Sequence, residues 1–364
     1  MNTKLFEPVN IGALRLRNRI VMAPMTRSRS GADGVPGDLV APYYAQRASA
    51  GLIISEGVSP AAIGRGYPMT PGIYTDAQVE KWRTVTDAVH REGGLIALQL
   101  MHTGRISSPG ALPDDATPVA PSAIKAEGQA FSLTGKHGYR VPHAMMTAEV
   151  QQTIKEYGDA ARRARDAGFD AVELHSASGY LAEQFLASKT NHRTDRYGGS
   201  RENRARFVIE TLEAMIDAVG ADRVGIKLAP EFAFNDMADA TPRETYPRLV
   251  EAIAPLGIAY LHVALLSPLV AAEGNPAFDY HAVLRPLFPG AYLRGGGLTK
   301  ATAEAVIETG QADAAVFGAL FIANPDLPQR LKLDAPFNTP DQKTIYGGGA
   351  EGYVDYPELA SVGV

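Results

Sequence analysis

The sequence predicts an α/β fold, a single (β/α)8 TIM barrel with an N-terminal β-hairpin cap and a long loop after the third strand. Three observations lead to this fold class. Short apolar runs alternate with longer amphipathic segments along the chain, and there are eight such runs. No low-complexity linker interrupts them, so we expect one domain over residues 1–364. Barrels of this type commonly exceed the ~150 residues of an average domain.

The eight apolar runs have the length of strands rather than of helices. They carry little period-2 alternation, which is typical of strands buried on both faces of a parallel sheet. A doubly wound open sheet is the competing fold, but eight regular repeats favour closure into a barrel. The runs are IVMAP (20–24), GLIISEG (51–57), LIALQL (95–100), AVELH (171–175), VGIKLA (224–229), YLHVA (260–264), AYLRGG (291–296) and AAVFGA (314–319).

The segments between the runs have helical spacing. One predicted helix opens at Thr75 and ends in a glycine pair, with its apolar residues on one face. A second starts at Ser200, a plausible N-cap, and stops at Gly220. The segments that begin at Thr147 and Thr299 have the same pattern. Helices therefore follow strands throughout the chain.

Composition excludes several classes of protein and site. The chain is 45% hydrophobic and 21% charged, and it contains no cysteine, which excludes disulfides, thiolate metal sites and cysteine nucleophiles. No His/Asp/Glu cluster has metal-ligand spacing, so no metal site is expected. The N-terminus has no apolar signal segment, and no run approaches ~18 apolar residues. The net charge of −5 comes without a basic stripe. We therefore expect a cytoplasmic protein with neither a nucleic-acid nor a membrane partner.

The stretch 107–142 breaks the alternation. It is rich in Pro, Gly and Ala and follows the third predicted strand. In a barrel this position is on the C-terminal face, where active sites are built. A long loop there is typical of a lid or a substrate wall.

Polar residues gather at the C-terminal ends of the predicted strands. Any one of them alone is more often a packed or hydrogen-bonded structural residue than a catalyst. Their occurrence at successive strand ends predicts that they converge at one mouth. They are Thr26, Gln99, His102, Arg105, His175, Tyr180 and Lys227.

The ends of strands seven and eight indicate a phosphate site. Barrels often bind phosphate there through backbone N–H groups and a short extra helix. The glycines of RGGG (294–297) permit close backbone approach, and NPDLPQRL (324–331) has the pattern of a short helix. A tight turn without a ligand is an equally simple interpretation of the glycines. The match of GGGAEG (347–352) to G-x-G-x-x-G follows no strand, and we discount it.

Eight motifs in order resemble one family, the Old Yellow Enzymes, which are FMN-dependent ene-reductases. The resemblance covers essentially the whole chain and is closest to the bacterial branch that reduces nitrate esters, morphinone and other enones. The motifs are LFEPVNIGALRLRNRIVMAPMTRSR, YYAQRASAGLIISEG, GYPMTPGIYTDAQV, QLMHTGRIS, AGFDAVELHSASGYLAEQFL, TNHRTDRYGGSRENRARF, FIANPDLPQRL and IYGGGAEGYVDYPEL.

The resemblance implies an FMN oxidoreductase that passes hydride from NAD(P)H to an activated alkene. It implies that His175 binds the substrate carbonyl and that Tyr180 protonates the α-carbon, and Ser178 is the third expected catalytic residue. Tyr67, Met101 and Tyr346 are expected to line the substrate pocket. The expected cofactor-binding residues are Pro24, Met25, Thr26, Gly57, Gln99, His175, Lys227, Arg294, Gly295, Gly296, Gly318 and Ala319.

Four positions depart from the family pattern. Ser178 stands where relatives have a second His or Asn, and a serine hydroxyl reaches less far. Lys227 replaces an Arg, which keeps the positive charge but loses the planar guanidinium that can donate two parallel hydrogen bonds. Met101 replaces an aromatic residue of the pocket. Ala319 replaces the Arg that grips the FMN phosphate, and we expect Arg294 to substitute for it.

The departures leave alternatives open. The first hypothesis is an FMN-dependent ene-reductase with unusual substrate preference. The second is a barrel that has weakened or lost FMN and uses His175 and Tyr180 for isomerisation or cyclisation. The third is a non-catalytic binding protein, which the dense polar mouth argues against. The sequence leaves open the substrate, the choice of NADH or NADPH, and whether the protein is a monomer or a homodimer.

Overall fold

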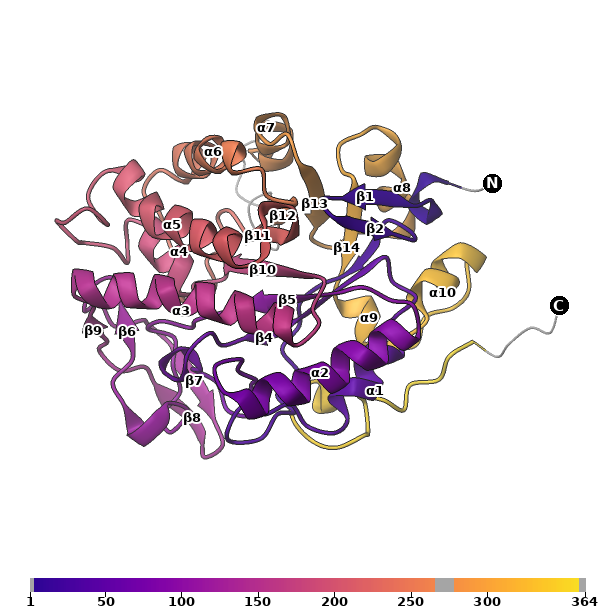
Figure 1. Ribbon diagram of the computed structural model, residues 1–364, viewed down its shortest axis with the longest axis horizontal. Coiled ribbons are helices and arrows are strands. Elements are labelled where there is room, and N and C mark those ends of the chain that lie inside the picture. The colour runs from indigo at the N-terminus through magenta and orange to yellow at the C-terminus, as the bar shows by residue number, and fades with distance from the viewer. Residues whose placement is uncertain (1–2, 266–277, 360–364) are drawn as a thin grey trace.

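The computed structural model describes residues 3–265 and 278–359 and contains a closed barrel of eight parallel strands (Figure 1). All eight predicted strands are confirmed, and nearly all their residues are buried on both faces. The order around the barrel follows the chain. The strands are β3 (Ile20–Met22), β4 (Leu52–Val58), β5 (Ile96–Leu100), β10 (Ala171–Ser176), β11 (Val224–Leu228), β12 (Tyr260–Ala264), β13 (Ala291–Gly295) and β14 (Ala314–Phe317).

Helices follow the strands and cover the outside of the barrel. The two predicted caps are confirmed, because the side chains of Thr75 and Ser200 accept hydrogen bonds from the N–H groups of Gln78 and Asn203. The helices are α1 (Val40–Ala45), α2 (Asp76–Arg91), α3 (Thr147–Asp166), α4 (Leu181–Leu186), α5 (Arg201–Val219), α6 (Pro242–Ile253), α7 (Tyr280–Leu287), α8 (Lys300–Glu308), α9 (Ala319–Ala323) and α10 (Leu327–Leu333). None in the described ranges is long and apolar enough to cross a membrane.

An N-terminal hairpin closes one end of the barrel. Strands β1 (Val9–Ile11) and β2 (Leu14–Leu16) pair antiparallel. The buried side chains of Ile11 and Leu14 belong to the same apolar cluster as the inward-facing residues at the bottom of the barrel. The hairpin and the strands of the long loop lie at opposite ends of the molecule (Figure 1).

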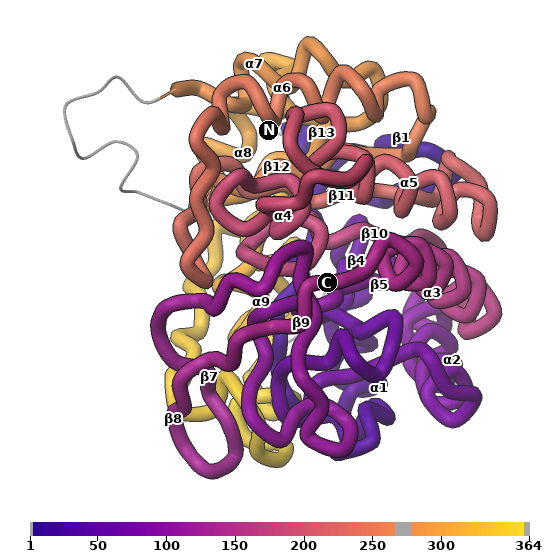
Figure 2. The backbone as a smooth tube through the Cα atoms, turned by 90° about the vertical axis from the view of Figure 1, so that its left-hand side faces the viewer, coloured from indigo at the N-terminus to yellow at the C-terminus, as the bar shows by residue number. Residues whose placement is uncertain are grey.

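The long loop after β5 lies over the other end of the barrel (Figure 2). It contains β6 (Val119–Ala120), β7 (Gln129–Ser132) and β8 (Gly135–Gly138), and β9 (His143–Ala144) follows it. Its residues Ala126, Ala130 and Tyr139 form one apolar cluster with Met101 and Tyr180. The loop therefore packs directly on the strand ends that carry the candidate site.

Several strand boundaries differ from the predicted runs by one or two residues, and the difference at the eighth strand bears on the site. The eighth strand was expected to run to residue 319, but β14 ends at Phe317 and Ala319 opens α9. The reason is local, because Gly318 has φ −104° and ψ −84°, which is not an extended conformation. Ala319 is consequently exposed at the first turn of a short helix.

Candidate active site

The register of the parallel strands places polar residues side by side at the barrel mouth. Gly57 on β4 pairs with Gln99 on β5, which pairs with Glu173 on β10. Two residues further along β10, His175 pairs with Lys227 on β11. Since side chains two apart on a strand share a face, Glu173 and His175 both point into the barrel. These residues come from four of the apolar runs that the sequence predicts to be strands.

A buried carboxylate organises the floor of the mouth. Glu173 Oε1 accepts a hydrogen bond from Gln99 Nε2 at 2.7 Å, and Glu173 Oε2 lies 3.0 Å from His262 Nδ1. A carboxylate only accepts hydrogen bonds, so it fixes the Gln99 amide with its oxygen turned away and free to accept another donor. Sequence analysis missed Glu173 and His262, although both lie on inward-facing strand positions. The period-2 rule applied to His175 would have identified Glu173.

His175 and Lys227 lie side by side on neighbouring strands, and both are buried. His175 Nδ1 has no hydrogen-bond partner in the described part of the chain. Desolvation, with smaller contributions from Lys227 and His262, lowers the pKa of His175 well below its ordinary value, so the ring is neutral near pH 7. Burial also lowers the pKa of Lys227, while the charge of Glu173 opposes that shift. A buried neutral imidazole can donate a hydrogen bond but is a poor source of a proton.

Tyr180 lies at the N-cap of α4, beside the ring of His175. The two ring centroids are 5.0 Å apart in an edge-on arrangement. The Tyr180 hydroxyl donates to the Tyr67 hydroxyl over 3.3 Å. Burial raises the pKa of Tyr180 to about 12, and the Tyr67 hydroxyl, which can turn to donate to the phenolate, partly offsets this rise. Tyr180 therefore keeps its proton throughout the physiological pH range.

Between His175 and Tyr180 the chain makes a turn with left-handed backbone at Ser178 (φ 59°) and Gly179 (φ 80°). The Ser178 carbonyl accepts a hydrogen bond from Asn235 Nδ2 at 2.8 Å. The Gly179 N–H donates to Glu183 Oε2 at 2.6 Å. A side chain at 179 would not fit, because its Cβ would lie 2.6 Å from the Cβ of Asn235. Asn235 is a second residue that sequence analysis missed.

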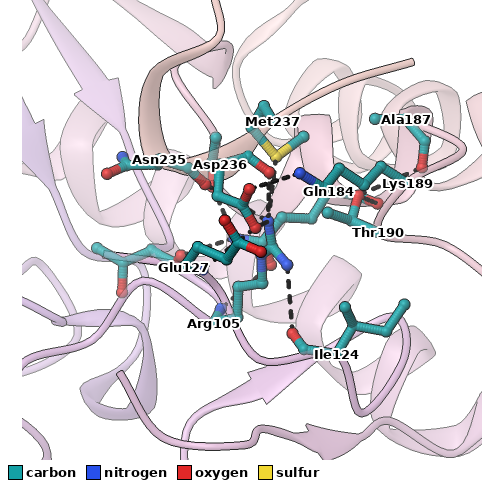
Figure 3. Close-up of polar contacts among 12 residues, drawn as sticks. Arg105, Ile124, Glu127, Gln184, Ala187, Lys189, Thr190, Asn235, Asp236 and Met237 are labelled. Carbon is teal, nitrogen blue, oxygen red and sulfur yellow. Dashed lines mark hydrogen bonds and ion pairs between the residues drawn. The ribbon is translucent and has the colours of Figure 1, made fainter. Parts of the chain in front are cut away.

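Arg105 does not reach the mouth, contrary to the expectation that it converges there with the other strand-end residues. Its guanidinium is 1% exposed and donates to the backbone oxygens of Ile124, Asn235 and Asp236 (Figure 3). It thus joins the long loop to the segment between β11 and α6. His102 is also buried away from the mouth, with Nδ1 accepting from the Gly104 N–H at 3.1 Å. Both residues have structural roles.

The ends of β13 and β14 present small residues to the mouth. A Cβ on Gly295 or Gly318 would meet its nearest neighbour at 3.4 or 3.6 Å, which is ordinary contact, so neither position is crowded. Arg294 faces the outside of the barrel instead. Its Nη1 lies 3.4 Å from Gln311 Oε1, and Gln311 precedes β14 at the opposite end of that strand. This corrects the expectation that Arg294 replaces the arginine missing at Ala319.

The C-terminal segment brings Tyr346 to the edge of the site. Arg27 Nε donates to the Ile345 carbonyl at 2.9 Å, and Gly347 N–H donates to the Arg27 carbonyl at 2.9 Å. These bonds hold both neighbours of Tyr346. Its side chain is 65% exposed but close enough to Tyr180 to affect the pKa of that phenol. On the other side of the mouth, Met101 is buried against Gly57.

Comparison with known proteins gives a consistent result. Residues 4–338 match the NADH:flavin oxidoreductase / NADH oxidase family. The chain belongs to this family. It is 42% identical to flavin oxidoreductase hxnT of Emericella nidulans, covering 97% of each chain, and 40% identical to 12-oxophytodienoate reductase 1 of Oryza sativa subsp. japonica, covering 98% of this chain and 94% of the relative.

Solved structures of similar proteins have the same fold. A structure of morphinone reductase in complex with tetrahydroNAD has a TM-score of 0.92 at 45% identity, covering 99% of each chain. The Old Yellow Enzyme homologue of Zymomonas mobilis has a TM-score of 0.93 at 40% identity, covering 97% of this chain and 99% of that one. The predicted family and barrel are therefore confirmed, and the chain is an FMN oxidoreductase that uses NAD(P)H.

The residues of the mouth fit the flavin of this family. A flavin presents both donors and acceptors along one edge, and the mouth offers the free oxygen of Gln99, the ammonium of Lys227 and the unpartnered Nδ1 of His175. Gly295 and Gly318 carry no side chain at the ends of β13 and β14, which suits a phosphate chain that approaches the backbone. Pro24, Met25 and Thr26 are half-buried just beyond β3, on the same rim.

Proposed function

We propose that this protein reduces the C=C bond of an α,β-unsaturated carbonyl compound with NAD(P)H, with His175 and Tyr180 as its catalytic residues. The family supplies the redox chemistry, since bound FMN accepts hydride from NAD(P)H and delivers it to an electron-poor carbon. The observation that carries the proposal is the adjacent pair of a neutral buried imidazole and a protonated buried phenol.

The two residues divide the work. His175 is neutral, so it acts as a hydrogen-bond donor to the carbonyl oxygen, where negative charge develops as hydride reaches the β-carbon. Tyr180 then gives its proton to the α-carbon. A phenol with a pKa of about 12 suits a strongly basic enolate carbon better than a stronger acid would, because it remains protonated until the enolate forms.

The remaining residues hold the cofactor and shape the pocket. Gln99 and Lys227 are placed to meet the polar edge of the flavin. Glu173 holds the Gln99 amide by a hydrogen bond, and its charge favours the protonated form of Lys227. A side chain at Gly57 would collide with Met101, and one at Gly296 with the Leu265 carbonyl, so both glycines serve close packing of the protein. Pro24, Met25 and Thr26 lie on the rim. Tyr67, Met101 and Tyr346 line the substrate side, and the loop 107–142 forms its outer wall. The balance is one hydride from NAD(P)H and one proton from Tyr180 per alkene.

Ala319 gives the main reason to retain the second hypothesis, a barrel that has lost FMN and performs acid–base chemistry with His175 and Tyr180. His175 and Tyr180 are needed by both hypotheses, so they do not decide between them. The polar floor of Gln99 and Lys227, however, has no use in an acid–base reaction without FMN. Two buried polar groups aimed at a ligand favour the flavin.

The test is spectroscopic. Protein purified without added flavin, and again after incubation with FMN and desalting, is expected to be yellow. Under anaerobic conditions NADPH should bleach the flavin band, and 2-cyclohexenone should restore it. Colourless protein that does not retain added FMN would overturn the proposal. Yellow protein that NADPH bleaches but that no enone re-oxidises would leave the cofactor correct and the substrate class wrong.

A further inference from the structure

Asn235 lies where the segment between β11 and α6 meets the catalytic turn. Its Nδ2 donates to the Ser178 carbonyl at 2.8 Å, and its Cβ packs against the backbone of Gly179. The amide also lies close enough to Tyr180 and Tyr67 to lower the pKa values of both phenols. One side chain therefore binds the turn and influences both phenols of the site.

An asparagine amide nitrogen has two hydrogens to donate. One is used by the Ser178 carbonyl, and the other is left to serve a phenol oxygen. A donor to a phenol oxygen stabilises the phenolate over the phenol. Once Tyr180 has lost its proton, the neighbouring Tyr67 hydroxyl can rotate and donate to it as well. The phenolate of Tyr180 would thus have two donors that oppose the unfavourable effect of burial.

The position of Asn235 is fixed by its neighbours rather than left to a flexible loop. Asn235 and Asp236 both have left-handed backbone, with φ 57° and 59°. Arg105 Nη2 donates to the Asp236 carbonyl at 2.8 Å and to the Asn235 carbonyl at 3.4 Å (Figure 3). Lys189 Nζ binds the Asp236 carboxylate at 2.5 Å. The amide is therefore held in place before substrate binds.

We propose that Asn235 is a positioning residue for the proton transfer, acting through Tyr180: its amide orients the phenol and stabilises the phenolate left behind. This inference rests on the proposed function. In the step concerned, the O–H bond of Tyr180 breaks and a C–H bond forms at the α-carbon. The negative charge moves from the enolate to the phenol oxygen, which later recovers a proton from solvent.

The inference also gives Ser178 a place in the site. Ser178 stands where the family pattern has a side chain that reaches the substrate carbonyl. Here the contribution of residue 178 is its backbone carbonyl, which anchors the Asn235 amide. The amide that is missing from the catalytic turn is thereby supplied from another segment, and it acts on the acid instead of on the carbonyl.

Two substitutions distinguish the effect of the Asn235 amide from the effect of its backbone conformation. Asn235→Gly keeps the left-handed conformation and removes the amide, and Asn235→Asp keeps the shape and removes the donor. Asp334→Gly is the matched control, since Asp334 is also left-handed (φ 51°) and its side chain is exposed at the end of α10. All three variants are to be studied as FMN-loaded full-length proteins.

The measurement is the rate of flavin re-oxidation in stopped flow, with 2-cyclohexenone and with benzoquinone as acceptors. Benzoquinone needs no proton at carbon. We expect Asn235→Gly to slow the enone reaction about 10- to 100-fold, and Asn235→Asp at least as much, because a carboxylate repels the phenolate. Reduction by NADPH, re-oxidation by benzoquinone, and every rate of Asp334→Gly should stay within about twofold of wild type.

Either of two results would overturn the inference. One is an unchanged enone rate in Asn235→Gly. The other is an equal loss with enone and benzoquinone, since this would indicate general damage to the site. A wild-type protein that benzoquinone re-oxidises and enone does not would instead refute the proposed function.

Discussion

The two sides of the barrel mouth are built in different ways. On the acid side, around the turn from β10 to α4, named side chains bind one another: Asn235 binds the Ser178 carbonyl, Glu183 binds the Gly179 N–H, and Tyr180 binds Tyr67. On the phosphate side, at the ends of β13 and β14, the chain offers glycines and Ala319. Arg294, the cationic side chain of β13, faces away from it.

This difference separates two properties of the protein. Proton transfer depends on side chains, so substitutions on the acid side should slow catalysis strongly. We expect phosphate binding to rely on backbone N–H groups, which all substitutions except proline leave in place, so the phosphate side should respond weakly to deletion and favourably to an added charge. Each prediction below tests one part of this contrast.

The largest effect is expected from Tyr180→Phe. Removing the proton donor should slow enone-dependent re-oxidation of the flavin about 10²- to 10⁴-fold, which is the usual contribution of general acid catalysis. Re-oxidation by benzoquinone should be nearly unchanged, because that acceptor needs no proton at carbon. Stopped-flow absorbance measures both. A Tyr180→Phe variant with wild-type enone kinetics would show that the proton comes from elsewhere.

Glu183 links the acid side to pH. Burial raises the pKa of Glu183 to about 7, above the ordinary value near 4.5 that it has in the unfolded chain. Its contribution to stability is therefore fully present below about pH 4.5 and is lost as the pH rises through 7. Glu183→Gln has no such titration. The free energy of unfolding of the variant relative to wild type should rise by up to about 3 kcal/mol over that range.

Urea unfolding of both proteins at intervals from pH 4 to pH 8 gives this difference. Glu213→Gln, on the exposed face of α5, serves as the control and should give a difference that does not vary with pH. A pH-independent difference for Glu183→Gln as well would mean that the carboxyl is already ionised in the folded protein at pH 5.

Ala319→Arg tests the phosphate side. Ala319 is exposed, so the longer side chain can be accommodated. A charge-assisted contact to a phosphate contributes about 1.5–3 kcal/mol, which corresponds to roughly a 10- to 100-fold tighter FMN complex. Fluorescence titration of the apoprotein with FMN measures the change, and Ala319→Gln controls for size. An unchanged Kd in Ala319→Arg would indicate that the phosphate does not lie beside residue 319.

The sequence was sufficient for the fold because the signals were local and repeated. Eight buried strands and the caps at Thr75 and Ser200 follow from periodicity and capping chemistry, which are properties of short segments. The acid pair His175 and Tyr180 could be identified for the same reason, since both lie in one motif. The boundary at Ala319 was missed because it depends on the backbone angles of Gly318.

The parts of the site that escaped prediction are long-range contacts. Asn235 and Ser178 are 57 residues apart, and Gln99 and Glu173 are 74 apart. Nothing in either local sequence fixes such a pairing, because it arises from strand register and from a loop held by Arg105. The side chain of Arg294 points outward for a similar reason, which only the assembled barrel shows. Successive side chains of β13 alternate between its two faces, and Leu293 points inward, so Arg294 points outward.

The smallest effect is expected from Arg294→Ala, and it is the most selective test of the contrast. The guanidinium lies near Gln311, Arg285 and His281 in an outer groove of about 200 Å³, separated from the mouth by the strand itself. Its removal should leave the Kd for FMN within about twofold of wild type, by the same fluorescence titration. A tenfold loss would require Arg294 to turn through the barrel wall, and the phosphate side would then depend on a side chain after all. The pair Ala319→Arg and Arg294→Ala thus asks whether charge matters at this phosphate site, and from which side of the strand it can act.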